Sequence, residues 1–335
     1  MKIAILTDSH FGFKKGSDIF SDHFQRFYEQ LFFPYLEEHK ITHILHLGDL
    51  FDNRRSIHIA AVKRARDMFF SKLGGYECKF IIGNHDTFFR DTLSVNSPSL
   101  LIDKDMIVDV PQEWMGIDLI PWINSENEDS VAEFIKNSTN RIAGGHFDLA
   151  GFYMNKGVKS QYTARSRESL NKYEKIFSGH FHTRSDDGHV YYIGAPYEMT
   201  WADYDDPRGF VVYDTETQEH DYIDNLHTIY AQCLYNNGLE YLPKDKIVKL
   251  IVERRENYSS FELLTYKLID QSIDVKIIEV LPDDVISVDV ADFEVIDTEK
   301  YLLGWVDRLE SDIHTIADKK SIKRLLSKMY KEAMT

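Results

Sequence analysis

Residues 1–215 alternate short apolar segments, rich in β-branched residues, with segments whose apolar residues recur at helical spacing. This alternation predicts an α/β fold with parallel βαβ units, in which the carboxyl ends of the strands share one edge of a sheet. The predicted strands are Lys2–Thr7, Thr42–Leu47, Lys79–Ile82, Ile107–Val110, Ile117–Ile120, Arg141–Gly144, Lys175–Phe177, Val190–Ile193 and Gly209–Tyr213. The predicted helices are Asp18–Glu38, Ser56–Leu73 and Glu126–Lys136, and the polar segment Ala150–Tyr173 is predicted to be a loop over the site.

Five short polar motifs each come just after one of these predicted strands. They are Asp8-Ser9-His10, Gly48-Asp49-Leu50-Phe51-Asp52, Gly83-Asn84-His85-Asp86, Gly145-His146 and Gly179-His180-Phe181-His182. Loops at this edge of the sheet carry the functional residues of α/β proteins. The Asp, His and Asn side chains offer only oxygen and nitrogen ligands, and this donor set suits divalent ions such as Mn²⁺, Fe²⁺ or Zn²⁺.

The number of candidate ligands indicates more than one metal ion. Seven ligands exceed what one tetrahedral ion needs, but they suit two ions that share a bridging carboxylate. Two ions ~3.5–4 Å apart can hold a phosphate group and lower the pKa of an attacking water. The motifs therefore predict phosphoester hydrolysis at a dinuclear metal centre.

Composition narrows the class of protein further. The 335 residues carry a formal net charge of −16, which argues against nucleic-acid binding by bulk basicity alone. The two cysteines exclude a disulfide framework and favour a reducing, cytosolic compartment. No apolar run approaches the ~18 residues of a membrane span, so no membrane partner is expected.

The sequence changes character after about Leu226. A strand over Lys246–Val252, a helix over Ser259–Ile269 and a strand over Asp274–Leu281 predict a small α+β domain. The run from Glu279 to Glu299 holds eight acidic residues and no Lys or Arg, which favours a solvated edge and linker. Two amphipathic helices are predicted in the tail after this run. We therefore expect three parts, at residues 1–225, 226–297 and 298–335.

The motif order D-x-H, G-D-x-x-D, G-N-H-D, G-H, G-H-x-H over residues 8–182 resembles the calcineurin-like metallophosphoesterase signature. Within that superfamily the chain is similar to the SbcD-type DNA repair nucleases, including those of T-even-type phages. The narrower likeness rests on Gly151-Phe152-Tyr153, Lys156-Gly157, Ile193-Gly194-Ala195-Pro196-Tyr197 and Asp206-Pro207-Arg208-Gly209-Phe210. The resemblance implies a four-layer α/β/β/α sandwich with a small α+β capping domain and C-terminal helices.

The resemblance also implies a role for each motif residue. The ligands of the first ion would be Asp8, His10 and His182, those of the second Asn84, His146 and His180, and Asp49 would bridge the two ions. A hydroxide at this centre would attack the phosphodiester, and His85 would protonate the departing 3′ oxygen without binding metal. Asp52 resembles the superfamily acid that pairs with that histidine, although some nucleases of the family carry a histidine at this position.

The implied activity is Mn²⁺-dependent cleavage of DNA, with 3′→5′ exonuclease and structure-specific endonuclease action in recombination and double-strand break repair. The implied partners are DNA, a second copy of the chain that packs through the Ser56–Leu73 region, and an SbcC-type coiled-coil ATPase bound by the C-terminal helices. The apolar stripe of Ser56–Leu73 could instead pack onto its own sheet, and the C-terminal helices could pack onto the small domain. The expected location is the cytoplasm, or the host cytoplasm if the chain is phage-encoded.

Several alternatives stay open on the sequence alone. The chain could be a small phosphodiesterase or phosphatase of the same superfamily, or mainly an architectural tether for DNA ends. The basic residues Arg54, Arg55, Lys63, Arg64 and Arg66 could meet DNA phosphates or form a solvated face. His46 lies close to the second motif, but strand alternation favours a packing role for it.

Overall fold

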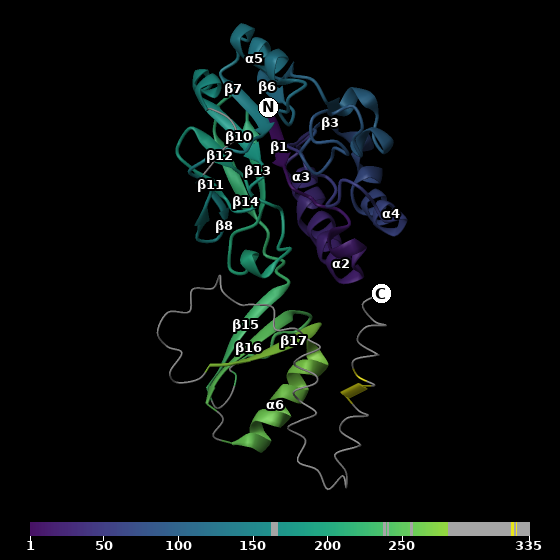
Figure 1. Ribbon diagram of the computed structural model, residues 1–335, viewed down its shortest axis with the longest axis vertical. Coiled ribbons are helices and arrows are strands. Elements are labelled where there is room, and N and C mark those ends of the chain that lie inside the picture. The colour runs from purple at the N-terminus through teal and green to yellow at the C-terminus, as the bar shows by residue number, and fades with distance from the viewer. Residues whose placement is uncertain are drawn as a thin grey trace.

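The computed structural model describes residues 1–161, 167–236, 239, 241–254, 257–280, 323, 324 and 326. Within these residues, two six-stranded sheets form the centre of the larger unit (Figure 1). The first has the order β14-β13-β1-β2-β3-β4, with β1 (Lys2–Leu6), β2 (His43–His46), β3 (Glu77–Ile81), β4 (Ile107–Val108), β13 (Gly209–Asp214) and β14 (His220–Asp224). The second has the order β11-β12-β10-β7-β6-β5, with β5 (Gln112–Trp114), β6 (Ile117–Ile120), β7 (Ile142–His146), β10 (Lys175–Gly179), β11 (Ser185–Asp186) and β12 (Val190–Tyr192).

The inner strands of both sheets are parallel, and this places the polar motifs together. Leu6 is in register with His46 on β2, and His46 with Phe80 on β3, so the first three motifs leave neighbouring strands at one edge. Gly179 on β10 is in register with His146 on β7, which brings the last two motifs to the corresponding edge of the second sheet. The antiparallel strands β13, β14, β5 and β11 flank this parallel centre.

Side chains along β1 point alternately to the two faces of the first sheet, and this shows how the layers are held together. Ala4 and Leu6 face an aromatic-rich core beneath the helices, whereas Ile3 and Ile5 face the core between the two sheets. A third core lies on the outer face of the second sheet, where α5 (Glu128–Asn137) contributes Val131. Both faces of each sheet are therefore covered, as expected for βαβ units. The predicted α/β/β/α sandwich is confirmed.

The helical layer over the first sheet differs in detail from the prediction. It contains α1 (Phe13–Gly16), α2 (Asp18–Phe27), α3 (Phe33–Glu38) and α4 (Ile59–Met68), which lie to the right of the strands in Figure 1. The predicted helix over Asp18–Glu38 is interrupted by a π-helical turn at Tyr28–Phe32. Pro34, in the first turn of α3, has no N–H to donate to the preceding turn, so regular α-helical hydrogen bonding does not pass through it.

The predicted loop Ala150–Tyr173 contains regular structure at both ends. A short hairpin pairs β8 (Tyr153–Asn155) with β9 (Val158–Lys159), and a 3₁₀ helix spans Glu168–Lys172. Other short 3₁₀ turns are Phe70–Gly75, Pro98–Leu100, Lys104–Met106 and Trp201–Asp203. The prediction missed β14, because this edge strand, His-Asp-Tyr-Ile-Asp, has too few apolar residues to show a strand pattern.

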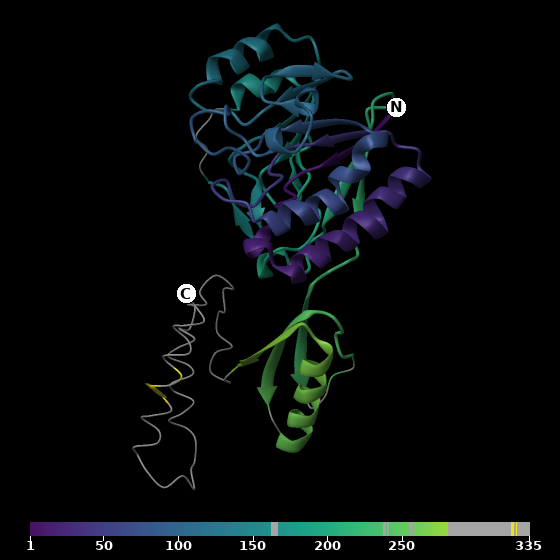
Figure 2. The same cartoon turned by 90° about the vertical axis from the view of Figure 1, so that its right-hand side faces the viewer.

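A smaller unit follows, joined to the sandwich by one connection (Figure 2). Its parallel sheet has the order β15-β16-β17, formed by β15 (Tyr230–Asn236), β16 (Ile247–Arg254) and β17 (Asp274–Glu279), and α6 (Tyr258–Gln271) packs on it. The Asn257 side chain caps α6 by accepting from the Ser260 N–H. Most of the acidic run and nearly all of the predicted tail helices lie outside the described residues. Among the helices that the structure describes, none has the length and apolarity needed to cross a bilayer.

The start of β15 is fixed to the sandwich by a buried carboxylate. Glu198 is 2% exposed, and its Oε2 accepts hydrogen bonds from the backbone N–H groups of Ile229 at 2.6 Å and Tyr230 at 3.0 Å. Beside it, the Lys249 ammonium lies 4.0 Å from the centroid of the Trp201 ring. The contacts of Glu198 and Lys249 therefore connect the two units.

We predict that Glu198→Ala lowers the free energy of unfolding by about 2–4 kcal/mol, because two buried N–H groups lose their acceptor. The urea midpoint and the melting temperature measure this change. Glu133→Ala, at an exposed position on α5, is the matched control and should leave both values unchanged. Equal stability of Glu198→Ala and the wild type would contradict this anchoring role.

Candidate metal centre

The five motif loops meet at one edge of the sandwich. Three groups of side chains there hold potential ligand atoms within 4.8 Å of one another: Asp8, His10 and His182; His10, Asp49 and His85; and Asp49, His146 and His180. Asp8, His10, Asp49 and His146 are buried, whereas Asn84, His85, His180 and His182 are half-buried. All the residues predicted from the motifs thus lie in or beside one cluster.

The first group is arranged to receive a cation. His10 Nε2 lies 3.1 Å from His182 Nε2 and 3.7 Å from Asp8 Oδ1. The other oxygen of Asp8, Oδ2, accepts from the Thr7 hydroxyl at 2.7 Å and from the His180 backbone N–H at 3.0 Å. Asp8 Oδ1 is buried without a hydrogen-bond partner. A buried carboxylate oxygen requires compensation, and a divalent cation between these atoms would supply it.

The second group shows the same convergence. His146 Nε2 lies 3.0 Å from Asn84 Oδ1, and His180 Nδ1 lies 3.0 Å from the same oxygen. His146 Nδ1 donates to the backbone carbonyl of Leu47 at 2.8 Å. Because a carbonyl only accepts, this bond places a ring proton on Nδ1, so Nε2 is the nitrogen that faces the cluster.

Asp49 lies between the two groups. Its Oδ2 is 3.8 Å from His10 Nε2 and 3.4 Å from His146 Nε2, so one oxygen faces ligands of both groups. Its Oδ1 accepts from the backbone N–H of His85 at 2.8 Å, which fixes the orientation of the carboxylate. This is the arrangement that a bridging ligand of two cations requires.

The backbone at the ligands is strained. Asp8, His10, Asp49 and His180 have positive φ values of 51°, 42°, 57° and 86°, a region that residues with a Cβ seldom adopt. At Gly83 an added Cβ would lie 2.3 Å from Asp49 Oδ1, so only glycine permits this approach. Strain of this kind persists only where the surrounding structure enforces it, and it gathers at functional sites.

The ionisation of the histidines follows their neighbours. Burial lowers the pKa of His146, but the charge of Asp49 and a hydrogen bond to it outweigh this effect and raise the pKa to about 9. Burial lowers the pKa of both His180 and His182 to about 4. The buried carboxylates therefore attract positive charge to the site, so cation binding would displace protons.

His85 contacts Asp52 in a different way from the one that the resemblance implies. His85 Nδ1 donates to the backbone carbonyl of Asp52 at 2.6 Å, whereas the Asp52 carboxylate lies 3.8 Å from His10 Nδ1. His85 therefore pairs with the main-chain carbonyl of Asp52 and not, as predicted, with its carboxylate. The His85 ring also lies against His10, with 5.0 Å between the ring centroids.

Asp86 is the main site residue that sequence reasoning missed. It is 1% exposed, and its carboxylate accepts from four backbone N–H groups, those of Gly83, Asp49, Leu50 and Phe51, at 2.8 to 3.4 Å. Burial and the charge of Asp49 raise the pKa of Asp86 to about 7, while the hydrogen bonds from the Gly83 and Phe51 N–H groups lower it. The carboxylate joins the second motif loop to the third. Its place two residues after a predicted ligand is the sequence signal that could have found it.

A second buried network holds the loop of His182. The Arg208 guanidinium is 2% exposed and pairs with Asp203 at 2.9 Å and Asp206 at 2.7 Å. It also donates to the backbone carbonyl of His182. Asp206 in turn accepts from the Thr183 hydroxyl at 2.9 Å. Through this network the Asp-Pro-Arg-Gly segment supports the loop that carries His182.

His46 lies beneath the centre and outside the ligand groups. Its Nδ1 accepts from the Gly48 N–H at 3.2 Å, and its Nε2 lies 2.8 Å from the Ser9 hydroxyl. Burial lowers its pKa to about 3, so the ring is neutral and supports the first two motif loops. Phe11 and Phe51 are likewise packed in the core under the helices.

With the fold and the site described, the chain is identified as a member of the calcineurin-like phosphoesterase superfamily, whose domain profile matches residues 1–218. The family implies divalent metal ions, which suits the donor groups described above. The chain is 30% identical to exonuclease subunit 1 of Enterobacteria phage T4 over an alignment of 349 residues that covers 99% of each protein. A solved structure from a study of an archaeal phosphodiesterase matches 67% of this chain and all of that chain, with 12% identity and a TM-score of 0.32. That similarity is too weak to support any conclusion.

We predict that Asp86→Asn weakens metal binding roughly 10–100-fold, because an amide NH₂ would then face backbone N–H groups that need an acceptor. Isothermal titration calorimetry with the metal ion measures this change in affinity. Asp91→Asn, at an exposed position in the same segment, is the matched control. Unchanged affinity in Asp86→Asn would show that Asp86 does not position the ligands.

Proposed function

We propose that this protein is a Mn²⁺-dependent DNA nuclease that acts as the nuclease subunit of an SbcC/SbcD-type complex. The observation that carries the proposal is the meeting of two ligand groups at Asp49 Oδ2, with His85 beside them. The similarity to an exonuclease subunit along 99% of the chain supports DNA as the substrate. The proposed direction is 3′→5′, with structure-specific endonuclease action in recombination and repair.

Each site residue has a proposed task. Asp8, His10 and His182 would hold one ion, Asn84, His146 and His180 the other, and Asp49 both. Ions bound there would neutralise the phosphodiester and lower the pKa of a nucleophilic water. His85 donates its Nδ1 proton to the Asp52 carbonyl, which fixes the ring and leaves Nε2 to protonate the departing 3′ oxygen. Asp52 is proposed to act as a positioning residue through this carbonyl.

We predict that His85→Ala lowers DNA cleavage about 10²–10⁴-fold while both metal ions stay bound. The measurement is cleavage of end-labelled duplex DNA with Mn²⁺, with metal content determined on the same samples. Chelation should abolish wild-type cleavage, and Mn²⁺ should restore it. His39→Ala, at an exposed position far from the centre in sequence, is the control.

The outcomes of this assay separate the alternatives. Equal cleavage by His85→Ala and the wild type would remove His85 from the mechanism. No cleavage by the wild type, even with its ATPase, would favour the architectural tether. Faster hydrolysis of nitrophenyl phosphate than of bis-nitrophenyl phosphate would identify a phosphomonoesterase instead.

The proposed partners follow from charge and from the tail. A subunit with a net charge of −16 can bind DNA only weakly by itself if a partner supplies much of the DNA-binding surface. In the described residues, Arg64 pairs with Asp18 at 2.8 Å and Asp22 at 2.6 Å, and Lys63 with Asp67 at 2.5 Å, so part of the basic face is neutralised locally. We propose that residues 298–335 bind an SbcC-type ATPase and that the chain forms a homodimer.

We predict that replacing Leu325 and Met329 by Asp abolishes co-elution with the SbcC-type ATPase, because both residues belong to the apolar stripe of the predicted tail helix. Size-exclusion chromatography of the mixed proteins measures this. Ser327→Asp introduces one negative charge off the stripe, and this variant should still bind. Retained binding by the double variant would contradict docking through the tail.

A further inference from the structure

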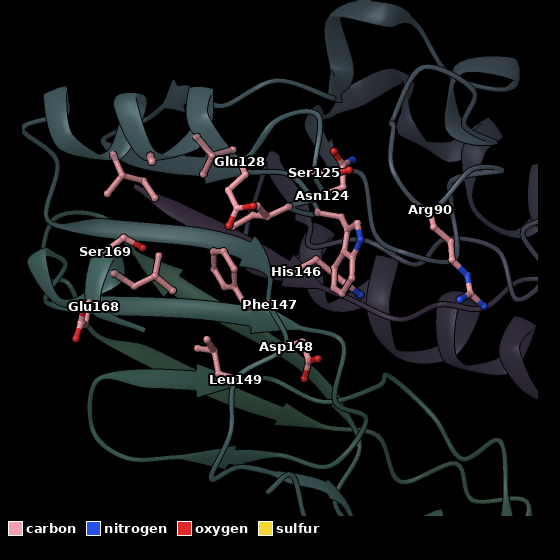
Figure 3. A pocket seen from close by; sticks show the side chains of 16 residues that line it. Arg90, Asn124, Ser125, Glu128, His146, Phe147, Asp148, Leu149, Glu168 and Ser169 are labelled. Atoms are coloured by element: carbon pink, nitrogen blue, oxygen red, sulfur yellow. The ribbon is translucent and has the colours of Figure 1, made fainter. Parts of the chain in front are cut away.

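A cavity of about 500 Å³ opens beside the metal centre (Figure 3). It lies between α5, the loop that follows β6 and the segment that follows β7. His146, a predicted ligand, forms part of its wall, so the cavity and the centre share this side chain. Its size falls within the range of small-ligand sites, about 300–1,000 Å³. The ligand assignments above do not account for it.

The deep wall of the cavity is apolar and aromatic. Val131, Ile135, Phe147 and Leu170 line it, and each is at most 3% exposed. At the end near the centre, the Trp122 ring lies 5.9 Å from the His146 ring and 5.3 Å from the His180 ring, measured between centroids. A flat ligand that extends from the centre would therefore meet the aromatic ring of Trp122 and the apolar side chains of the deep wall.

The charged side chains of the cavity favour the base of a nucleotide over its phosphate. Glu128 and Asp148 contribute carboxylates to the lining, and these would repel a phosphate while accepting hydrogen bonds from the N–H groups of a base. Arg90 lies toward one end of the view in Figure 3, on an exposed part of the wall, where it could meet a phosphate outside. The Glu128 side chain points from α5 toward Phe147.

We propose that this cavity receives the nucleobase of the nucleotide whose phosphate lies at the metal centre. The inference rests on the proposed function and deepens it, since a base can enter the cavity only when it is unpaired and unstacked. The substrate class is therefore a DNA end whose terminal nucleotide is single-stranded, frayed or mismatched. Stacking on the aromatic wall would replace the stacking that the base loses.

The test fills the cavity by a substitution that changes none of the candidate metal ligands. Ala132 lines the cavity from an exposed position on α5, so Ala132→Trp adds bulk there. The control, Lys136→Trp, introduces the same residue at an exposed position on the same helix outside the lining. The substrates are thymidine 5′-(p-nitrophenyl phosphate) and methyl p-nitrophenyl phosphate, which share a leaving group and differ in that the first carries a nucleoside where the second carries a methyl group. We expect Ala132→Trp to raise KM for the thymidine ester at least about tenfold, with kcat little changed. The methyl ester should be hydrolysed as by the wild type.

Failure of this inference can be told apart from failure of the proposed function. If the wild type hydrolyses neither ester with Mn²⁺, the phosphodiesterase assignment itself is wrong. If it hydrolyses both, and Ala132→Trp affects both equally or neither, only the cavity assignment is overturned. A second measurement needs no variant: an abasic terminal nucleotide should slow wild-type cleavage of single-stranded DNA about tenfold or more. Equal rates on abasic and normal ends would also overturn the inference.

Discussion

The rest of the site depends on the burial of two carboxylates, Asp8 and Asp49, which are 0% and 2% exposed. Removing such groups from water is costly unless hydrogen bonds and opposite charge compensate for it. One oxygen of each accepts backbone N–H bonds, and the other faces histidine nitrogens. The positive φ angles of the ligands follow from this constraint, since each loop must bring its side chain inward within a few residues of its strand.

The loops around these carboxylates are held by charged groups that bind no metal in our assignment. Asp86 fixes the second and third motif loops through four backbone N–H groups, and Arg208 fixes the last loop through a carbonyl and two carboxylates. These buried hydrogen bonds and ion pairs hold the loops that carry the candidate ligands, as preorganisation of a site requires.

Much of the fold, and the proximity of the candidate ligands to one another, was predictable from the sequence. The parallel strands show as β-branched apolar runs, and the position of Asp8, His10 and Asp49 just after such runs predicts that they meet. Strands β14 and β15 were not predicted; β14, for example, is a polar edge strand held by pairing to β13. The interruption at Tyr28–Phe32 was also missed, although Pro34 signals it.

The sequence by itself determined which residue types meet at the centre, because strand order and the shared edge of a parallel sheet bring the motif loops together. Only the tertiary structure decided which atoms of these residues face one another at the centre. Three features each depend on how segments far apart in the chain are placed: the contact of Asp49 Oδ2 with both histidine groups, the pairing of His85 with the Asp52 carbonyl, and the cavity beside His146. Such placement comes from the packing of the two sheets against each other, which no local pattern encodes.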